Sequence, residues 1–143
     1  MTAGFRIRGR AIGPGHPTYI VAELSGNHNQ SFALAAKTVE AACRAGVDAI
    51  KLQTYTPDTL TIDCANKWFR VGGTNRAWRG QTLYTLYGKA HTPWEWQPKL
   101  QRIAARHGVE FFSSAFDESA VDFLETLRVP AYKVASFEIV DLE

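Results

Sequence analysis

Apolar residues follow two patterns along this chain: short continuous runs, and longer stretches in which they recur every three or four positions. Continuous runs are typical of strands that are covered on both faces, and the longer spacing is typical of helices with one buried face. The two patterns alternate. The strands are expected at residues 19–24, 47–54, 109–115 and 131–136, and the helices at residues 32–44, at residues 97–108 and after residue 117.

Residues that begin and end helices stand at the borders of these stretches. Ser31 and Asp117 can accept hydrogen bonds from the first amides of the helices that follow them. Gly46 stands where the first helix should stop. Pro98 cannot donate an amide inside a helix, so either the first turn after residue 92 is irregular or the main helix begins near Gln97. We favour the later start.

Two segments fall outside the alternation of strands and helices. Residues 5–12 alternate apolar and basic side chains around a glycine, which predicts a small β-hairpin within an N-terminal unit of residues 1–17. Residues 55–91 form a long polar insert, with a short helix expected at residues 82–89. Inserts of this length usually form lids or binding loops, and a packing surface for another subunit is the alternative.

The order of strands and helices predicts βαβ units in a parallel sheet. Reactive side chains follow the carboxyl end of every expected strand, which is the habit of (β/α)8 barrels. Residues 18–143 provide four such units. The expected fold class is therefore α/β, the N-terminal half of a (β/α)8 TIM barrel preceded by a small β-hairpin. Its outer two strands would leave apolar edges exposed, so we expect the isolated chain to self-associate or to be insoluble.

Composition narrows the classes of protein to consider. With 143 residues and 45% hydrophobic content, the chain can build one globular domain with a sizeable core. Its net charge is +2 and its Lys and Arg residues are dispersed, which gives no basic patch for nucleic acid. No run has the length of a membrane span, and residues 1–15 lack the apolar core of a secretory signal, so we expect a cytoplasmic protein without a membrane partner. Cys43 and Cys64 lack metal-ligand spacing and fit reduced thiols.

The side chains at the expected strand ends can bind a compact anion. Ammonium groups act as point charges on phosphate or carboxylate, and hydroxyl groups donate to their oxygens. Carboxylates in the same cavity can move protons or bind sugar hydroxyls. The alternative is structural, with the lysines and the glutamates forming salt bridges. The candidates are Glu23, Lys51, Ser113, Ser114, Lys133, Ser136 and Glu138.

Several separated stretches carry a more specific signal than any single residue. They read AELSGNHNQS, AIKLQTYTPDT, TPWEW, FFSSAFD, DFLE and PAYKVASFEI. Together they resemble the N-terminal half of the sialic acid synthase family, and most closely its pseudaminic acid synthase branch. The resemblance implies a (β/α)8 barrel that condenses phosphoenolpyruvate with an N-acetylated amino sugar and releases phosphate. The branch implies 2,4-diacetamido-2,4,6-trideoxy-altrose as the sugar and pseudaminic acid as the product, for cell-surface glycans such as those of flagellin. N-acetylneuraminate and legionaminate synthases are the alternatives.

The resemblance also assigns roles to the strand-end residues. Lys51 and Lys133 would hold the phosphoenolpyruvate anion, and hydroxyl groups from the third and fourth strand ends would donate to its oxygens. Glu23 would activate the water that attacks C2 of the intermediate, and Glu138 would contact the sugar near its C1 aldehyde. The expected substrate-binding residues are Asn27, His28, Gln53, Asn75, Ser113, Ser114, Phe116 and Ser136.

A divalent metal ion, Mn or Mg, is implied by the same resemblance, with histidine ligands on strands later than those of this chain. We therefore expect no metal ligand within the chain and no synthase turnover from its 143 residues alone. His28 lies in a polar loop and is expected to shape that loop or to contact substrate rather than to bind metal. The expected partners are phosphoenolpyruvate, the amino sugar and a second copy of the protein in a homo-oligomer, a dimer.

Two other interpretations remain open. A class I aldolase would use Lys51 or Lys133 as a Schiff-base amine, which requires a lysine made nucleophilic by burial or by a neighbouring cation. A non-catalytic half-barrel would serve as an assembly or binding module.

Overall fold

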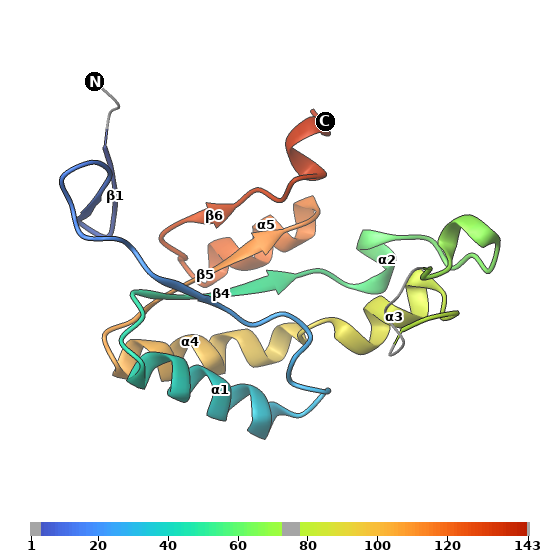
Figure 1. Cartoon of the computed structure of the whole chain (residues 1–143), viewed down its shortest axis with the longest axis horizontal. Coiled ribbons are helices and arrows are strands. Elements are labelled where there is room, and N and C mark those ends of the chain that lie inside the picture. The colour runs from blue at the N-terminus through green and yellow to red at the C-terminus, as the bar shows by residue number, and fades with distance from the viewer. Residues whose placement is uncertain (1–3, 73–77, 143) are drawn as a thin grey trace.

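A four-stranded parallel sheet in the order β3-β4-β5-β6 forms the centre of the computed structural model, which describes residues 4–72 and 78–142 (Figure 1). Each strand lies beside the next one in the sequence, as consecutive units of a barrel do. The strands are β3 (Val21–Glu23), β4 (Ala49–Thr54), β5 (Glu110–Ala115) and β6 (Tyr132–Lys133). The helices are α1 (Phe32–Arg44), α2 (Pro57–Leu60), α3 (Leu83–Ala90), α4 (Gln97–Arg106) and α5 (Glu118–Thr126). Short 3-10 turns span Lys67–Phe69, Trp94–Trp96 and Glu138–Val140.

Helices α1 and α4 lie side by side along one face of the sheet (Figure 1). Ile50 and Leu52 of β4 are fully buried in one apolar cluster with Val39 of α1 and Leu100 of α4. Burial of a side chain of this size stabilises the fold by roughly 1.5–3 kcal/mol. Because side chains alternate along a strand, Lys51 points to the opposite face of the sheet. The sheet therefore has one apolar face covered by helices and a second face that carries polar groups.

The helix borders follow the capping residues that the sequence predicts. The hydroxyl of Ser31 accepts a hydrogen bond from the Leu34 amide at 3.3 Å, at the start of α1. The carboxylate of Asp117 accepts one from the Ser119 amide at 3.0 Å, at the start of α5. Gly46 follows α1 with a φ of +86°, a conformation that glycine adopts without strain. These predictions are confirmed.

The start of α4 contains both of the predicted alternatives. The helix begins at Gln97 with Pro98 in its first turn, where a missing amide donor costs nothing. A 3-10 turn, Trp94–Trp96, precedes it and forms the irregular first turn. The favoured later start is therefore confirmed.

The prediction of a buried strand at residues 19–24 is wrong in length and in burial. Only Val21–Glu23 pairs with β4, and Ile20 and Val21 are 50% and 38% exposed. β3 is the edge of the described sheet, and Val21 points away from the face that α1 and α4 cover. The run is apolar enough for two covered faces, but only one of its faces is covered.

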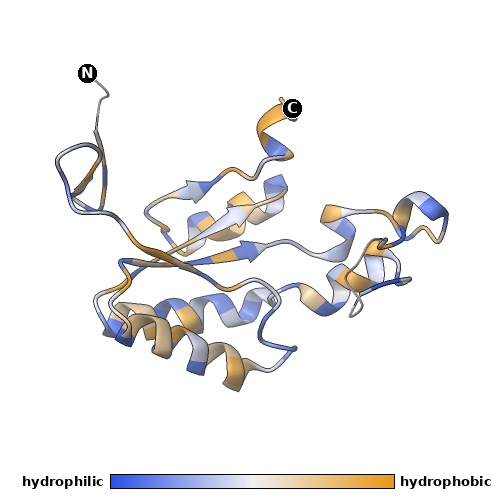
Figure 2. Cartoon of the chain, viewed as in Figure 1, coloured by the Kyte–Doolittle hydropathy of each residue, from blue (hydrophilic) through white to orange (hydrophobic). Residues whose placement is uncertain are grey.

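The prediction of a strand at residues 131–136 is also too long. Only Tyr132–Lys133 pairs with β5, and Ser136 lies beyond the strand, before the turn Glu138–Val140. The segment carries large exposed apolar side chains, and Figure 2 colours much of it as hydrophobic. They are Val134, Phe137, Ile139, Val140 and Leu142. This surface and the edge at β3 are the exposed apolar edges that the sequence predicts.

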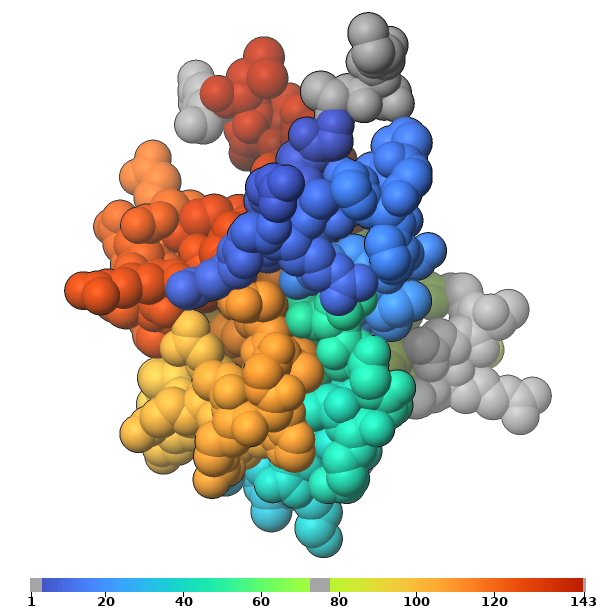
Figure 3. All heavy atoms as spheres, turned by 90° about the vertical axis from the view of Figure 1, so that its left-hand side faces the viewer, coloured from blue at the N-terminus to red at the C-terminus, as the bar shows by residue number. Residues whose placement is uncertain are grey.

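The predicted hairpin consists of β1 (Phe5–Ile7) and β2 (Arg10–Ile12), joined by a turn at Arg8 and Gly9. Both turn residues have positive φ, at 44° and 84°, as the twist of a tight hairpin favours. Arg10 forms an ion pair with Asp48, whose other oxygen accepts a hydrogen bond from the backbone amide of Ile20 at 2.7 Å. The hairpin therefore lies over the N-terminal edge of the sheet, where Figure 3 shows it in dark blue.

The insert between β4 and α4 contains α2 and α3. Helix α3 spans Leu83–Ala90, which confirms the short helix predicted at residues 82–89. The loop after β3 holds the end of α3 in place. Gln30 Nε2 donates to the carbonyl oxygens of Lys89 and His91 at 2.9 and 2.7 Å. A Cβ on Gly26 would lie 3.0 Å from the Cβ of Ala90, so the backbone approaches α3 as closely as glycine permits. Within the described residues, no helix is long and apolar enough to cross a membrane.

Candidate active site

Five polar side chains form a continuous row across the open face of the sheet. Strand register pairs Glu23 of β3 with Lys51 of β4, and it aligns Gln53 of β4 with Ser114 of β5 and Lys133 of β6. Lys51 and Gln53 are two positions apart, so they share a face, and that face is opposite to the buried Ile50 and Leu52. We call Glu23, Lys51, Gln53, Ser114 and Lys133 the polar row.

Glu23 is the point at which the row is most tightly connected. Its Oε1 lies 2.9 Å from the Lys51 ammonium and accepts hydrogen bonds from Gln53 Nε2 and Ser25 Oγ, both at 3.3 Å. The Lys51 side chain is 12% exposed and the Glu23 side chain 42%. The hydrogen bond from Lys51 is the main reason that the pKa of Glu23 lies below its usual value, and the charge of Lys133 adds to the effect. With two ammonium groups and one carboxylate, the row carries a surplus of positive charge.

The two adjacent serines of β5 face opposite sides of the sheet. Ser114 belongs to the polar row and is 2% exposed. Ser113 is fully buried on the helix side, where its Oγ lies 2.7 Å from the hydroxyl of Thr54, which donates to Gln97 Oε1 at 3.0 Å. The structure therefore brings Ser114 to the candidate site but places Ser113 in a buried network below it.

Lys133 and Glu138 line one hollow of 510 Å³ at the β6 end of the row, together with Phe116 and Asp117. One oxygen of Glu138 and one of Asp117 are buried without a hydrogen-bond partner. Buried carboxylate oxygens normally have partners, so this hollow has unused capacity to accept hydrogen bonds. Ser136 is exposed, near this end of the row in sequence but outside the strand.

His28 holds the loop after β3 against the insert. It is 2% exposed, its Nδ1 accepts from the Gln30 amide at 3.2 Å, and its Nε2 lies 3.1 Å from the Thr92 hydroxyl. Since Nδ1 accepts, Nε2 carries the proton and donates to Thr92. Burial lowers the pKa of His28, which favours the neutral ring. Of the two alternatives for this residue, the geometry supports shaping the loop.

A second hollow, of 480 Å³, lies between the loop after β3 and helix α3; we call it the insert hollow. Its lining combines apolar and aromatic side chains with side-chain amides. Asn27 is one of these amides, and its Oδ1 also accepts a hydrogen bond from the Ser25 amide at 3.1 Å. Its lining includes Asn27, Gln53, Tyr55, Trp78, Leu86 and Tyr87.

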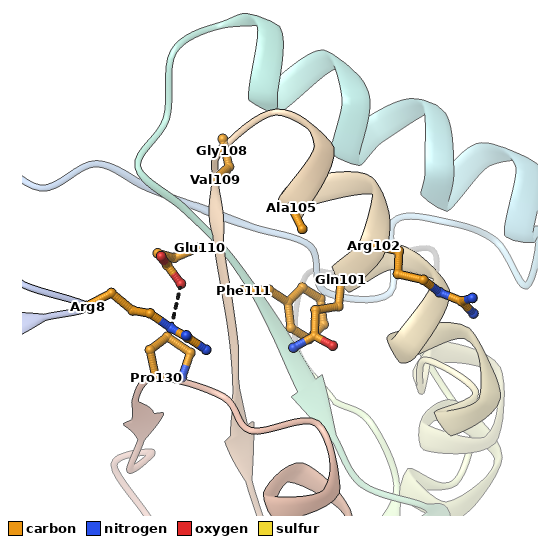
Figure 4. A pocket seen from close by; sticks show the side chains of 9 residues that line it. All are labelled: Arg8, Gln101, Arg102, Ala105, Gly108, Val109, Glu110, Phe111 and Pro130. Carbon is orange, nitrogen blue, oxygen red and sulfur yellow. Dashed lines mark ion pairs between the residues drawn. The ribbon is translucent and has the colours of Figure 1, made fainter.

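Another hollow, of 340 Å³, lies at the opposite, N-terminal edge of the sheet (Figure 4). There Arg8 of the hairpin turn faces Glu110 at 3.4 Å and donates to the carbonyl of Arg128 at 3.1 Å. Gln101 of α4 donates to the carbonyl of Leu127 at 2.9 Å. These polar groups already bind protein atoms, so the hollow is a seam that joins the hairpin to the sheet rather than a candidate site.

No cluster of three His, Cys, Asp or Glu side chains that could hold a metal ion occurs in residues 4–72 and 78–142. Asn75, one of the expected substrate contacts, lies outside the described residues. Both thiols are free, with Cys43 buried within α1 and Cys64 half-buried in the insert.

Sequence reasoning missed the aromatic and aliphatic walls of the insert hollow. Leu86, Tyr87 and Ala90 all line it from α3. Their spacing of three and four residues was a detectable signal, because it places them on one face of the helix and so predicts that this face is apolar. Tyr55 directly follows β4 and is 4% exposed.

Comparison with known proteins agrees with this geometry. A model of the NeuB family matches residues 38–143. The pseudaminic acid synthase of Helicobacter pylori is 46% identical over 127 residues, which cover 89% of this chain and 37% of that enzyme. The N,N'-diacetyllegionaminic acid synthase of Legionella pneumophila is 36% identical over 124 residues, which cover 87% of this chain and 34% of that enzyme. The chain thus spans about a third of the length of these relatives.

Among solved structures, the N-acetylneuraminic acid synthetase of Leptospira borgpetersenii matches with a TM-score of 0.76 at 24% identity. The match covers 98% of this chain and 44% of that one. At this identity the likeness concerns the fold, and it confirms the barrel-type arrangement of strands and helices.

Proposed function

The chain belongs to the NeuB family, and from that premise we propose that it supplies the donor-binding part of a pseudaminic acid synthase. The proposed reaction condenses phosphoenolpyruvate with 2,4-diacetamido-2,4,6-trideoxy-altrose, gives pseudaminic acid and releases phosphate. The observation that carries the proposal is the polar row, in which four neighbouring strands each contribute a polar group to one face. The identity to the Helicobacter pylori enzyme supports this branch of the family.

Charge supports phosphoenolpyruvate as the donor. The molecule carries close to three negative charges at neutral pH, because a phosphate monoester loses its second proton with a pKa of about 6. Lys51 and Lys133 place two ammonium groups on the same face, and the Ser114 hydroxyl lies in register with Lys133. Neutralising the donor both binds it and stabilises the negative charge that develops on the departing phosphate. Ser136, which follows β6, would also donate to the oxygens of the donor. The oxygen of Glu138 that has no hydrogen-bond partner would face the sugar.

The pairing of Glu23 with Lys51 supports a role for Glu23 as the base. An anionic donor competes with the carboxylate for the Lys51 ammonium, which is 2.9 Å away. Losing that partner removes the largest cause of the low pKa of Glu23, so the carboxylate becomes a stronger base once the donor is bound.

The proposed steps follow from these positions. C3 of phosphoenolpyruvate forms a bond to C1 of the sugar aldehyde as the C=O π bond breaks. The aldehyde oxygen takes a proton from solvent and becomes a hydroxyl, and C2 of the donor becomes electron-poor. Water adds its oxygen to C2 and gives its proton to Glu23. The C2–O bond to phosphate then breaks, and the remaining proton of the C2 hydroxyl leaves with the phosphate, which gives the ketone and free phosphate. Glu23 returns its proton to solvent. Glu138 would accept a hydrogen bond from the sugar near C1, through the oxygen that has no partner in the structure.

The divalent ion implied by the family, Mn or Mg, would polarise the sugar aldehyde. The described residues do not fit such an ion by themselves, because they contain no cluster of three ligating side chains. The proposal therefore places its ligands outside this chain and derives no step from it.

Two alternatives differ in chemistry. A legionaminate or N-acetylneuraminate synthase would use the same polar row with another sugar. The similarity to the enzyme of Legionella pneumophila supports the legionaminate alternative. For a class I aldolase, Lys51 must attack a carbonyl, but in the structure its side-chain nitrogen is engaged by the Glu23 carboxylate at 2.9 Å.

The proposal is tested with the polypeptide as its gene encodes it, by measuring phosphate release from phosphoenolpyruvate in the presence of the sugar. Lys51→Ala should lower kcat/KM for phosphoenolpyruvate by about 100-fold or more, since it removes a charged partner and leaves Glu23 to repel the donor. Lys37→Ala is the matched control, because Lys37 is exposed on α1. An equal effect of both substitutions, or a borohydride-trapped adduct of a pyruvate donor on Lys51 or Lys133, would overturn the proposal.

A further inference from the structure

The insert hollow is continuous with the polar row through one residue. Gln53 donates to Glu23 at 3.3 Å within the row and also lines the hollow. A molecule bound over Gln53 can therefore occupy both places at once. The hollow lies on the β3 and β4 side of the sheet, whereas Glu138 and Lys133 line the hollow at the β6 end.

The walls of the insert hollow are held in position by the surrounding fold. The Tyr55 ring packs edge-on against the rings of Tyr87 and Phe116, at centroid distances of 5.7 and 5.5 Å. The carbonyl of Tyr55 accepts a hydrogen bond from Trp94 Nε1 at 3.2 Å. Together with the close approach of Gly26 to the end of α3, these contacts preform the hollow before any ligand enters.

The lining has the chemistry of a site for a small neutral amide. Tyr55, Trp78 and Leu86 offer apolar surface, and Asn27 and Gln53 contribute side-chain amides to the lining. None of the described residues that line the hollow is charged, so these residues offer no ion pair to a phosphate or a carboxylate. An acetamido group fits both features, because its methyl contacts the apolar walls while its N–H and C=O bond to amides.

We infer that the insert hollow binds the C4 acetamido group of the sugar, and that Trp78 and Leu86 select sugars that carry it. The inference rests on the proposed function. The sugar reacts at C1, which the proposal places near Glu138 at the β6 end. Phe116 of that hollow contacts Tyr55 of the insert hollow at a ring-centroid distance of 5.5 Å, so a sugar that lies above the donor can extend from one hollow into the other. A hydroxyl at C4 would leave the apolar walls without a partner. The insert thus sets the preference of the site for a sugar with an acetamido group at C4.

The test compares two sugars with the polypeptide as its gene encodes it. One is 2,4-diacetamido-2,4,6-trideoxy-altrose, and the other is its analogue with a hydroxyl in place of the C4 acetamido group. The measured quantity is the ratio of their kcat/KM values in phosphate release. Trp78→Ala and Leu86→Ala should each lower this ratio by about tenfold, because each removes apolar contact with the methyl group. The KM for phosphoenolpyruvate should stay unchanged.

Two further variants keep the test decisive. Leu83→Ala lies on the same helix but does not line the insert hollow, so its ratio should match that of the wild type. Leu86→Phe narrows the hollow instead of emptying it, and it should also lower the ratio. This variant provides the test if the alanine variants fail to fold. A ratio that stays unchanged in active Trp78 and Leu86 variants overturns the inference and leaves the proposed function standing. Absence of phosphate release from the wild type with either sugar defeats the proposed function and the inference with it.

Discussion

Replacing Ser113 and Ser114 by alanine, one at a time, should separate two roles that adjacent residues perform. Ser114 is in register with Gln53 and Lys133 on the open face, whereas Ser113 is bonded to Thr54 beneath the sheet. Both serines are almost fully buried, and both substitutions remove the same atom. Each variant is therefore the matched control for the other.

The two substitutions should differ in which quantity they change. A hydrogen bond to a charged group contributes about 1.5–3 kcal/mol, so Ser114→Ala should raise the KM for phosphoenolpyruvate roughly 10- to 150-fold. Ser113→Ala leaves the Thr54 hydroxyl with only its bond to Gln97, at 3.0 Å. Removing one partner from a buried polar group costs about 1–3 kcal/mol, so this variant should unfold at a lower temperature with an unchanged KM.

Steady-state phosphate release and thermal unfolding, measured on the polypeptide as its gene encodes it, check both expectations. A raised KM in Ser113→Ala together with an unchanged KM in Ser114→Ala would mean that Ser113, and not Ser114, points to the open face of the sheet. An unchanged KM in both variants would remove the hydroxyl from the proposed donor site.

Three further predictions concern pH, the insert and the apolar surface. The pKa of Glu23 is lowered in the folded state, so its ion pair stabilises the protein above the ordinary carboxyl pKa of about 4.3, and this contribution is lost as the pH falls through the folded pKa. Over that acidic range the thermal midpoint of Glu23→Gln should fall less steeply than that of the wild type. The difference should be small because the Glu23 side chain is 42% exposed. Gly26→Ala should speed hydrogen exchange in α3, because the new Cβ would lie 3.0 Å from the backbone of α3. Gly88→Ala, whose Cβ would make an ordinary contact at 3.7 Å, should not speed it. Equal exchange rates in the two variants would contradict the close packing of the loop at Gly26 against α3. Lysine at Phe137 and Ile139, which are 85% and 66% exposed, should reduce self-association of the 143-residue chain in sedimentation velocity, and an unchanged distribution would show that this surface is not the cause.

The helices were predictable because their signals are local. The caps at Ser31 and Asp117 and the stop at Gly46 each depend on a few neighbouring residues, and the structure keeps them. The outer strands were not predictable in the same way. Burial of residues 19–24 depends on what covers the second face of the sheet, and an apolar run alone does not contain that information.

The candidate site was predictable to the level of strands but not of side-chain direction. Carboxyl ends of parallel strands meet at one edge, which is why Glu23, Lys51 and Lys133 come together. Which of two neighbouring serines joins them depends on strand register, and a shift of one residue exchanges the two faces. His28 has the chemistry of a ligand, but its partner Thr92 is 64 positions away in the sequence, so its structural role is visible only in the fold.

The failed burial prediction and the accessible polar row have the same physical cause. α1 and α4 bury one face of the sheet, and the other face leaves Val21 38% exposed beside the 42% exposed side chain of Glu23. A carboxylate and an ammonium at that face retain contact with water, which lowers the cost of keeping both ionised. They also remain within reach of a charged ligand that could not penetrate a core. The incomplete cover of this apolar strand is thus the feature that the proposed chemistry needs, since an anionic donor can reach Lys51 only through the part of its side chain that the described residues leave exposed, which is 12%.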